Sequence, residues 1–408
     1  MKLRLIRWRF GGLARHGSLL LCWMLLRAIM QAAMIMLLAR QLGAESYGLF
    51  VALVATASFF TPFVGLGLSH MLLRNAARDP ANEAAYLGRA LRSWARTLPL
   101  CGIAALVFAL WVLPKHGTFI TLCAIIAAEL AAVSLTELCA RHWQARQQTN
   151  AYGAINAGLP GVRLLALGLL FLFVRNVEIN ATLWVYAISS LLYAGLLWIL
   201  VRSERVEPDA LTPEPMTASN GLPFSFAAFA MKLQAEFNKP ALAQVGLGLA
   251  GTYNIAQRAV DLACLPLVAL QEALWPRLYG VSNPIRQLSS IGAALLGLAL
   301  AVGIVVWLAA PLIPYVLGKS FAGVVPALRL LAWLPILQVL RALLNFLAIH
   351  RSQMQQIGWV HAAGAGLSVV AVSAFVPTYG ISGAILAAYV AEIAVVTFLI
   401  AIAARAAR

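Results

Sequence analysis

The stretch LLLCWMLLRAIMQAAMIMLLARQLGAESYG, residues 19–48, combines a long apolar run with an arginine near its middle, Arg27. A run of about 20 apolar residues is long enough to cross a bilayer as a helix. A charge at the centre of the bilayer costs about 2.5–3.5 kcal/mol on insertion scales. Either this run lies outside a membrane, or Arg27 faces something other than lipid.

The composition decides in favour of a membrane. The chain has 408 residues, of which 62% are hydrophobic and 11% are charged, and its mean hydropathy is +0.85. Soluble domains have about 45–50% apolar and about 25% charged residues. We therefore predict an all-α integral membrane protein. Its five cysteines stand singly in apolar runs, which indicates packing and no metal or disulfide role.

Apolar runs of spanning length recur along the whole chain and predict about twelve transmembrane helices. They lie at residues 17–39, 47–73, 94–113, 118–139, 153–174, 181–201, 222–243, 252–274, 288–316, 322–349, 357–376 and 381–403. The basic N-terminus is followed by no small-residue cleavage site, so the first run is expected to be an uncleaved helix.

The distribution of basic residues predicts the topology. Most lysines and arginines outside the runs fall on alternate connections, beginning with the N-terminus. Cytoplasmic loops carry such an excess, so we expect an even number of spans with both termini cytoplasmic. This topogenic role also accounts for the net charge of +16, which is therefore no sign of nucleic-acid binding.

A polar segment divides the chain near its middle. Residues 202–221, RSERVEPDALTPEPMTASNG, are rich in proline, acids and small polar side chains, which is typical of a linker. We expect residues 1–201 to form an N-terminal six-helix lobe and residues 222–408 a C-terminal one. Transporters are commonly built from two such related halves around a central site.

The predicted spans contain six basic and six acidic residues. Residues of this kind usually face a bundle interior or an aqueous cavity, which makes them functional candidates. The basic ones are Arg27, Arg163, Lys232, Arg258, Arg329 and Arg341, and the acidic ones are Glu129, Glu137, Glu236, Asp261, Glu272 and Glu392.

Two local pairings are expected from helical spacing. Lys232 and Glu236 lie four residues apart and can pair on one helix face, or line a cavity. Arg258 and Asp261 lie three apart and allow the same pairing. Asn254 shares their face, and a polar stripe on a membrane helix favours a cavity lining.

Arg27 has no acidic residue at the adjacent turns of its own helix, where Gln31 follows four residues later. Its partner must therefore come from another helix or from a ligand. An anionic ligand and a carboxylate such as Glu129 or Glu392 remain equally open. Arg163, ten residues into the fifth run, poses the same choice.

Other intramembrane charges have simpler or undecided roles. Arg329 and Arg341 lie close to the ends of one span, so we expect both to anchor at the membrane interfaces. Several carboxylates could carry a proton or a cation, because burial favours their protonated form, but pairing with the arginines accounts for them equally well. These are Asp261, Glu129, Glu137, Glu392 and Glu272.

No enzymatic motif is visible. Gly318-Lys319-Ser320 resembles the end of a P-loop, but Ile313 stands where the first glycine is needed. The sequence contains neither HExxH nor GxSxG. We therefore predict a protein that is not an enzyme and that needs no cofactor.

Four segments together resemble a known family. Residues 27–68, RAIMQAAMIMLLARQLGAESYGLFVALVATASFFTPFVGLGL, contain an arginine in the first span and an LxRxLGxxxYG turn at 38–48. Residues 251–258 carry GxYxxAxR, and residues 316–333 and 379–387 are similar to later signatures. In this order they resemble the polysaccharide-export, Wzx-type oligosaccharide flippase family of the multidrug/oligosaccharidyl-lipid/polysaccharide exporter superfamily. One departure is EFNKP at 236–240, where many relatives have an Asp-Arg pair.

The resemblance implies a flippase of the bacterial cytoplasmic (inner) membrane that moves a polyprenyl-pyrophosphate-linked oligosaccharide to the outer leaflet by alternating access. It implies partners such as a polysaccharide polymerase and glycosyltransferases, besides membrane lipids. Arginine suits an anionic pyrophosphate because it donates several hydrogen bonds from a permanent charge. The substrate-binding candidates are then Arg27, Gln31, Arg258, Asn254, Lys232 and Arg163, and the coupling-ion candidates are Asp261, Glu129, Glu392 and Glu272.

Two other functions stay open. A multidrug or organic-cation antiporter of the same superfamily would have a cavity dominated by acids. A non-transporting assembly factor of a polysaccharide complex would tolerate neutralisation of the cavity charges but not changes to its surface loops.

Overall fold

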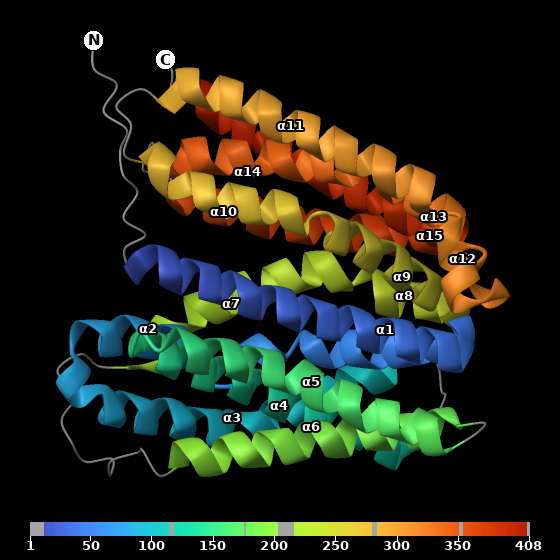
Figure 1. The fold of residues 1–408 in the computed structure, drawn as a ribbon, viewed down its shortest axis with the longest axis horizontal. Coiled ribbons are helices and arrows are strands. Elements are labelled where there is room, and N and C mark those ends of the chain that lie inside the picture. The colour runs from blue at the N-terminus through green and yellow to red at the C-terminus, as the bar shows by residue number, and fades with distance from the viewer. Residues whose placement is uncertain are drawn as a thin grey trace.

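The computed structural model describes residues 12–113, 118–174, 177–202, 216–279, 284–350 and 354–405. Within these residues the secondary structure is entirely helical, as predicted (Figure 1). The first half of the chain forms α1 (Gly12–Ser58), η1 (Thr61–Phe63), α2 (Leu68–Arg78), η2 (Pro80–Asn82), α3 (Glu83–Val112), α4 (Phe119–Ala145), α5 (Thr149–Phe173) and α6 (Ile179–Arg202). The second half forms α7 (Ala218–Glu236), α8 (Asn238–Val245), α9 (Leu247–Ala263), α10 (Leu265–Tyr279), α11 (Pro284–Ala309), α12 (Leu312–Leu317), η3 (Lys319–Phe321), α13 (Val324–Leu331), α14 (Leu334–His350) and α15 (Met354–Arg405).

Two long helices are interrupted by a glycine. Gly43 in α1 has φ 72° and ψ 175°, and Gly380 in α15 has φ 56° and ψ −127°. Glycine adopts positive φ without the steric cost that other residues have. Each helix therefore turns back on itself (Figure 1). Helix α15 contains two of the predicted spans, whereas α1 contains the first span and only the beginning of the second, which continues through η1 into α2. Both turns lie at the same end of the bundle, on the right in Figure 1, which we call the Gly43 end; the opposite one is the Pro80 end.

Eight segments of the described chain are long and apolar enough to cross a membrane. They are Leu19–Phe63, Pro80–Val112, Phe119–Ala145, Thr149–Phe173, Ile179–Arg202, Ser289–Ala309, Val324–Ile349 and Gln356–Ala404. The predicted seventh and eighth spans are not among them, and each is divided into two helices, at Phe237 and at Cys264. The expected linker ends earlier than 221, because α7 begins at Ala218, and residues 203–215 lie outside the described part.

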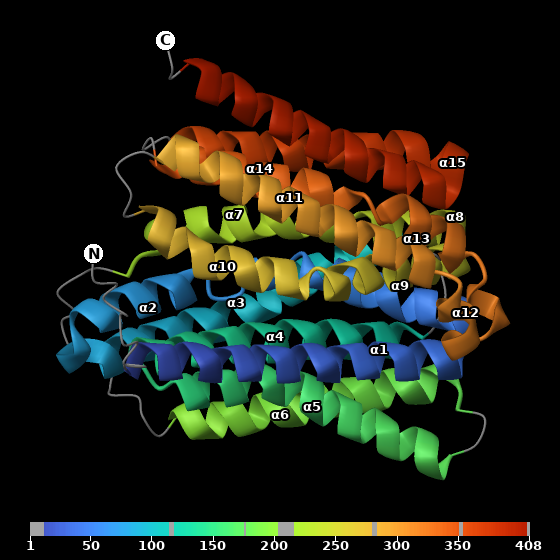
Figure 2. The ribbon, with the colours of Figure 1, turned by 45° about the horizontal axis from the view of Figure 1, so that its top comes forward.

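The largest buried cluster joins the two halves of the chain. It includes Leu38, Tyr47 and Phe50 of α1, and it continues through Tyr253 of α9 to Phe321. Helix α1 lies between α5 of the first half and α9 of the second (Figure 2). Smaller apolar clusters belong to one half each. The interface between the halves is thus a continuous core near the Gly43 end.

Glycines bring backbones of the two halves into direct contact at both ends. A Cβ atom added to Gly48 of α1 would lie 1.7 Å from the carbonyl oxygen of Leu247 in α9. A Cβ atom added to Gly67 would lie 2.2 Å from the carbonyl oxygen of Gly221 in α7. Any larger residue would force these helices apart.

Candidate functional site

A cavity of about 300 Å³ lies between the two halves and is lined by five of the twelve predicted intramembrane charges. It is bounded by α1, α4, α5 and α6 on one side and by α7, α8 and α9 on the other. We call it the central cavity. Its polar lining residues are Gln31, Tyr47, Glu129, Arg163, Tyr186, Glu236, Lys239, Asn254, Arg258 and Asp261.

On the first side, the charges form a closed network. Arg163 Nη2 of α5 lies 3.0 Å from Glu129 Oε1 of α4, and Tyr186 of α6 donates a hydrogen bond to the same carboxylate. The guanidinium also stacks on the Tyr186 ring at 4.2 Å and donates to Ser190 Oγ at 2.8 Å. Glu129 and Arg163 are buried, so removal of either charge leaves the other without compensation.

On the second side, the charges form an open chain. Glu236, the last residue of α7, pairs with Lys239 of α8 and with Arg258 Nη2 of α9 at 3.2 Å. Arg258 Nη1 lies 3.5 Å from Asp261 Oδ2, which confirms the pairing expected from their spacing. The side chain of Arg258 is 40% exposed, whereas that of Lys239 is 1% exposed. Arg258 is therefore the more accessible cation for a ligand.

Towards the Gly43 end, two pairs of asparagine and tyrosine side chains lie close to the central cavity, which Tyr47 and Asn254 line. Asn254 Nδ2 of α9 donates to the Tyr47 hydroxyl of α1 at 2.6 Å, and Asn238 Nδ2 donates to the Tyr253 hydroxyl at 2.6 Å. Phe321 packs edge-on against Tyr47. These contacts lie beside the close approach of Gly48 to α9, so polar and apolar contacts hold the two halves together at the same end.

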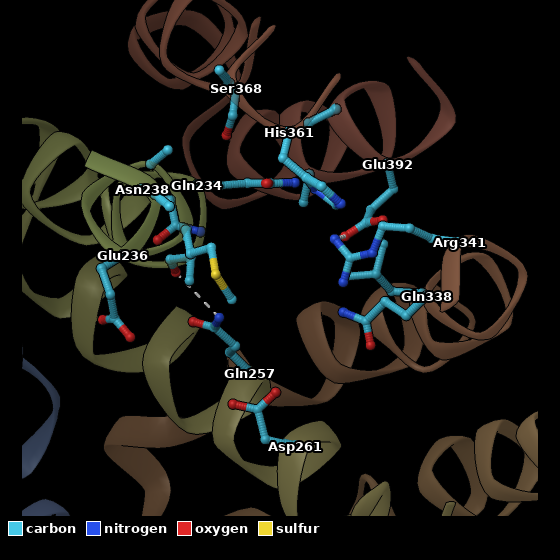
Figure 3. Close-up of a pocket in the computed structure, with 18 of the residues that line it drawn as sticks. Gln234, Glu236, Asn238, Gln257, Asp261, Gln338, Arg341, His361, Ser368 and Glu392 are labelled. Atoms are coloured by element: carbon cyan, nitrogen blue, oxygen red, sulfur yellow. Dashed lines mark hydrogen bonds and ion pairs between the residues drawn. The ribbon is translucent and has the colours of Figure 1, made fainter. Parts of the chain in front are cut away.

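A second, larger cavity lies within the second half of the chain. Its volume is about 1160 Å³, and Glu236, Arg258 and Asp261 line both cavities. We call it the C-half cavity. Figure 3 shows its polar side chains converging from α7, α9, α14 and α15. These are Gln234, Glu236, Asn238, Gln257, Arg258, Asp261, Gln338, Arg341, Asn345, His361, Ser368 and Glu392.

The C-half cavity corrects the expectation for Arg341. Instead of anchoring at an interface, Arg341 Nη1 lies 2.8 Å from Glu392 Oε1 of α15, inside the cavity (Figure 3). Nearby, His361 Nε2 and Asn345 Oδ1 are 3.3 Å apart. Glu392 comes from a helix distant in sequence, so spacing alone could not reveal this pair.

Arg27 lies outside the lining of both cavities. It is exposed on α1 one turn before Gln31, and its Nη1 donates to Asn156 Oδ1 of α5 at 3.4 Å. Its expected acidic partners are taken, Glu129 by Arg163 and Glu392 by Arg341. Among the described residues Arg27 has no acidic partner, which favours the ligand alternative.

Lys232 does not pair with Glu236. Its ammonium donates to Thr61 Oγ1 of η1 at 2.6 Å, in a separate pocket of about 60 Å³. Glu137 of α4 also lines this pocket, where it contacts His70 Nε2 at 3.3 Å. The Lys232–Glu236 pairing is wrong because α7 ends at Glu236, whose carboxylate turns to α8 and α9.

Arg329 lines neither cavity in the described structure. Arg329 stacks on Trp307 at 4.5 Å, so it packs on an aromatic side chain. The side chain of Glu272 lies outside the described part of α10. The described residues contain no group of three or more His, Cys, Asp or Glu side chains that could hold a metal ion.

Sequence reasoning missed several lining residues. Lys239 enters the sequence analysis only as part of the EFNKP departure at 236–240, although it is buried and lines the central cavity. Gln338, Arg341 and Asn345 were not grouped, although their spacings of three and four place them on one face of α14. That spacing is the signal that could have identified the C-half cavity.

Comparison with known proteins gives a family and a fold. A family model described as "Polysaccharide biosynthesis protein" matches residues 13–279. Comparison with curated proteins gives no match. Solved structures match at low identity over nearly the whole chain.

An inward-facing multidrug resistance MATE family transporter of the MOP superfamily is 14% identical, with a TM-score of 0.69, over 93% of this chain and 94% of that one. An outward-facing one is 13% identical, with a TM-score of 0.60, over 97% and 95%. A MOP superfamily transporter from Pyrococcus furiosus, described as having a binding pocket of reverse polarity, is 14% identical, with a TM-score of 0.58, over 97% and 96%.

Proposed function

The chain belongs to the polysaccharide biosynthesis protein family, and from this membership we propose that it is a flippase for a polyprenyl-pyrophosphate-linked oligosaccharide. It has the fold of MOP superfamily transporters. The substrate would pass from the cytoplasmic to the outer leaflet of a bacterial inner membrane, for synthesis of a surface polysaccharide. A polymerase and glycosyltransferases of the same route would be its partners.

The observation that carries the proposal is the central cavity. A lipid-linked oligosaccharide has an anionic pyrophosphate, a polar glycan and an apolar tail. The cavity places Arg258 and Lys239 between the halves of the chain, and the accessible Arg258 can exchange a carboxylate for a phosphate oxygen. Arginine forms strong, often bidentate hydrogen bonds with phosphate.

We assign the first pyrophosphate contact to Arg27. It is exposed on α1 near Gln31, a residue of the central cavity, and it has no acidic partner in the described structure. A permanent charge held by a single 3.4 Å hydrogen bond to Asn156 is available to an anion. The substrate would then pass from Arg27 to Arg258, with Arg163 fixed in its pair with Glu129.

Movement would follow alternating access between two six-helix lobes, in a chain of twelve spans with both termini cytoplasmic. The Gly43 end would face outwards, and the contacts of Tyr47, Gly48 and Phe321 hold the two halves together there. Release would require α1 to separate from α9 there. Asp261, Glu129 and Glu392 are the carboxylates proposed to take up a coupling ion.

A multidrug or cation antiporter is the second candidate, because the structural neighbours include multidrug resistance transporters. Such a cavity would need acids available to a cation. In this structure each cavity acid faces a base: Glu129 faces Arg163, Glu236 and Asp261 face Arg258, and Glu392 faces Arg341. The pairing favours the flippase. A scaffold for a polysaccharide complex would need none of these pairs.

The test is deletion of the gene, followed by quantification of lipid-linked oligosaccharide and surface polymer. We expect the lipid-linked units to accumulate and the polymer to disappear, and the wild-type gene to restore both. Normal amounts of both in the deletion strain would exclude the flippase, provided that no second flippase is encoded.

Variants of Arg258 and Arg27 then distinguish a flippase, which needs these arginines, from a non-transporting scaffold. Complementation with Arg258→Ala or Arg27→Ala is expected to fail, and Arg→Lys variants are expected to restore export only in part. Arg202→Ala is the matched control, because Arg202 is exposed at the end of α6, outside both cavities. Full export by both Ala variants, at normal protein levels, would favour the scaffold.

A further inference from the structure

The C-half cavity differs from the central cavity in its chemistry. Besides its charged residues it is lined by five side-chain amides, with His361 and Ser368. The amides are Gln234, Asn238, Gln257, Gln338 and Asn345. A side-chain amide both donates and accepts hydrogen bonds, which is the capacity needed to bind hydroxyl groups.

Two of these side-chain amides are not used in hydrogen bonds within the described structure. Gln234 of α7 and Gln338 of α14 form no hydrogen bond with any described residue, and both reach into the cavity from opposite sides (Figure 3). Polar side chains in protein interiors are normally hydrogen-bonded, and an unmade bond has a free-energy cost. These two amides are therefore free to bind a ligand.

Further acceptors in the lining are also unpaired. Asn238 donates through Nδ2 to Tyr253 and Gln257 donates through Nε2 to the Ala235 carbonyl, which leaves Asn238 Oδ1 and Gln257 Oε1 without donors. Glu392 Oε2 is a third buried oxygen without a partner. The side chains thus leave several acceptors that hydroxyl donors would satisfy.

The charge balance indicates a neutral polar ligand. Glu392 is neutralised by Arg341, and Glu236 and Asp261 face Arg258 together with Lys239. No excess of acid remains for an organic cation. Trp359, which is 78% exposed and lines the same cavity, adds a broad apolar surface.

Size and position agree with a ligand of several rings. The cavity volume of about 1160 Å³ exceeds the roughly 300–1,000 Å³ of pockets for drug-sized molecules. Arg258 lies at the junction with the central cavity, so a ligand anchored there by an anionic group can extend into the amide-lined space.

We infer that the C-half cavity binds the oligosaccharide portion of the substrate, with Gln234 and Gln338 contacting its hydroxyl groups, while the pyrophosphate lies at Arg258. This assignment rests on the proposed flippase function. The amides of the C-half cavity thereby determine which glycan is accepted, and Arg258 recognises the part that all such lipids share.

The experiment compares two probes on the purified full-length protein in detergent. One is undecaprenyl diphosphate, which has the anion and tail but no sugar, and the other is lipid-linked oligosaccharide extracted from the deletion strain. Dissociation constants are measured for wild type, Gln234→Ala, Gln338→Ala and Arg258→Ala. The matched control is Gln356→Ala, because Gln356 is exposed on α15 and does not line the cavity.

We expect wild type to bind the glycan-bearing lipid more tightly than undecaprenyl diphosphate. Gln234→Ala and Gln338→Ala should each weaken only the glycan-bearing lipid, by about tenfold for a lost hydrogen bond. Arg258→Ala should weaken both probes, and Gln356→Ala neither.

Other results overturn specific claims. If the amide variants weaken neither probe, or both equally, while Arg258→Ala weakens both, the glycan site is excluded and the flippase function stands. If wild type binds neither lipid, the proposed function fails and the glycan site fails with it.

Discussion

The strongest test of the proposed movement is a reversible bond between α1 and α9 at the Gly43 end. A Cβ atom built on Gly248 lies 3.9 Å from Ala44 Cβ. Disulfide-bonded cysteines have Cβ atoms about 3.5–4.5 Å apart. The double variant Ala44→Cys, Gly248→Cys should therefore cross-link under mild oxidation without moving the backbone.

This disulfide restricts the separation of α1 from α9 that release of the substrate requires. From 3.9 Å, the Cβ–Cβ distance can grow by only about half an ångström before it leaves the disulfide range. Opening a path for a sugar between Gly48 and Leu247, whose backbones are in contact, needs several times that separation. We expect the export rate to fall in proportion to the cross-linked fraction and to recover after reduction.

The assay uses a background in which the five native cysteines are replaced, so that only the new pair can react. Loss of labelling by a maleimide-linked polymer measures cross-linking, and accumulated lipid-linked oligosaccharide measures export. The controls are the two single variants and Ala44→Cys with Gly297→Cys, because a Cβ atom at Gly297 has no neighbour within 4 Å. Complete cross-linking with wild-type export would refute the requirement that α1 and α9 separate.

Two predictions concern stability. Arg163→Met leaves the buried carboxylate of Glu129 without its cation, so we expect the free energy of unfolding to fall by about 3–5 kcal/mol. The measurement is the thermal unfolding midpoint in detergent, which should be lower than that of wild type. An unchanged midpoint would show that the pair is dispensable for stability. Gly67→Ala places a Cβ atom 2.2 Å from the Gly221 carbonyl oxygen at φ 69°, and should destabilise by at least the 1–2 kcal/mol or so of left-handed strain. Gly102→Ala, in open space on α3, should be neutral or stabilising in the same melting assay, and equal effects of both glycine changes would contradict the close-contact argument.

The fold was largely predictable because hydropathy and helix length are local properties. Each apolar run corresponds to one or two helices, and the pairing of Arg258 with Asp261 follows from spacing within α9. The breaks at Phe237 and Cys264 were not predicted, although Pro240 and Pro266 follow them within three residues, because the apolar residues around each break were interpreted as one continuous span. Whether there are twelve spans and two lobes stays a prediction.

The partners of the other charges depend on tertiary structure and could not be predicted. Lys232 has a suitable acid one turn away, yet it donates to Thr61 because η1 packs against α7. Arg341 of α14 pairs with Glu392 of another helix, α15. Helical spacing shows which residues share a face, but not which helix that face meets.

The glycine turns of α1 and α15 have a practical consequence for topology mapping. Because one residue, Gly43 or Gly380, reverses each helix, almost no chain is available there to accommodate an inserted sequence. A reporter enzyme or epitope inserted at either position would have to separate two packed helices. Absence of a reporter signal would then indicate misfolding, and not the side of the membrane on which the turn lies. At this end the short helix α12 (Leu312–Leu317) is a better insertion point than either glycine, because Tyr315 within it is 91% exposed.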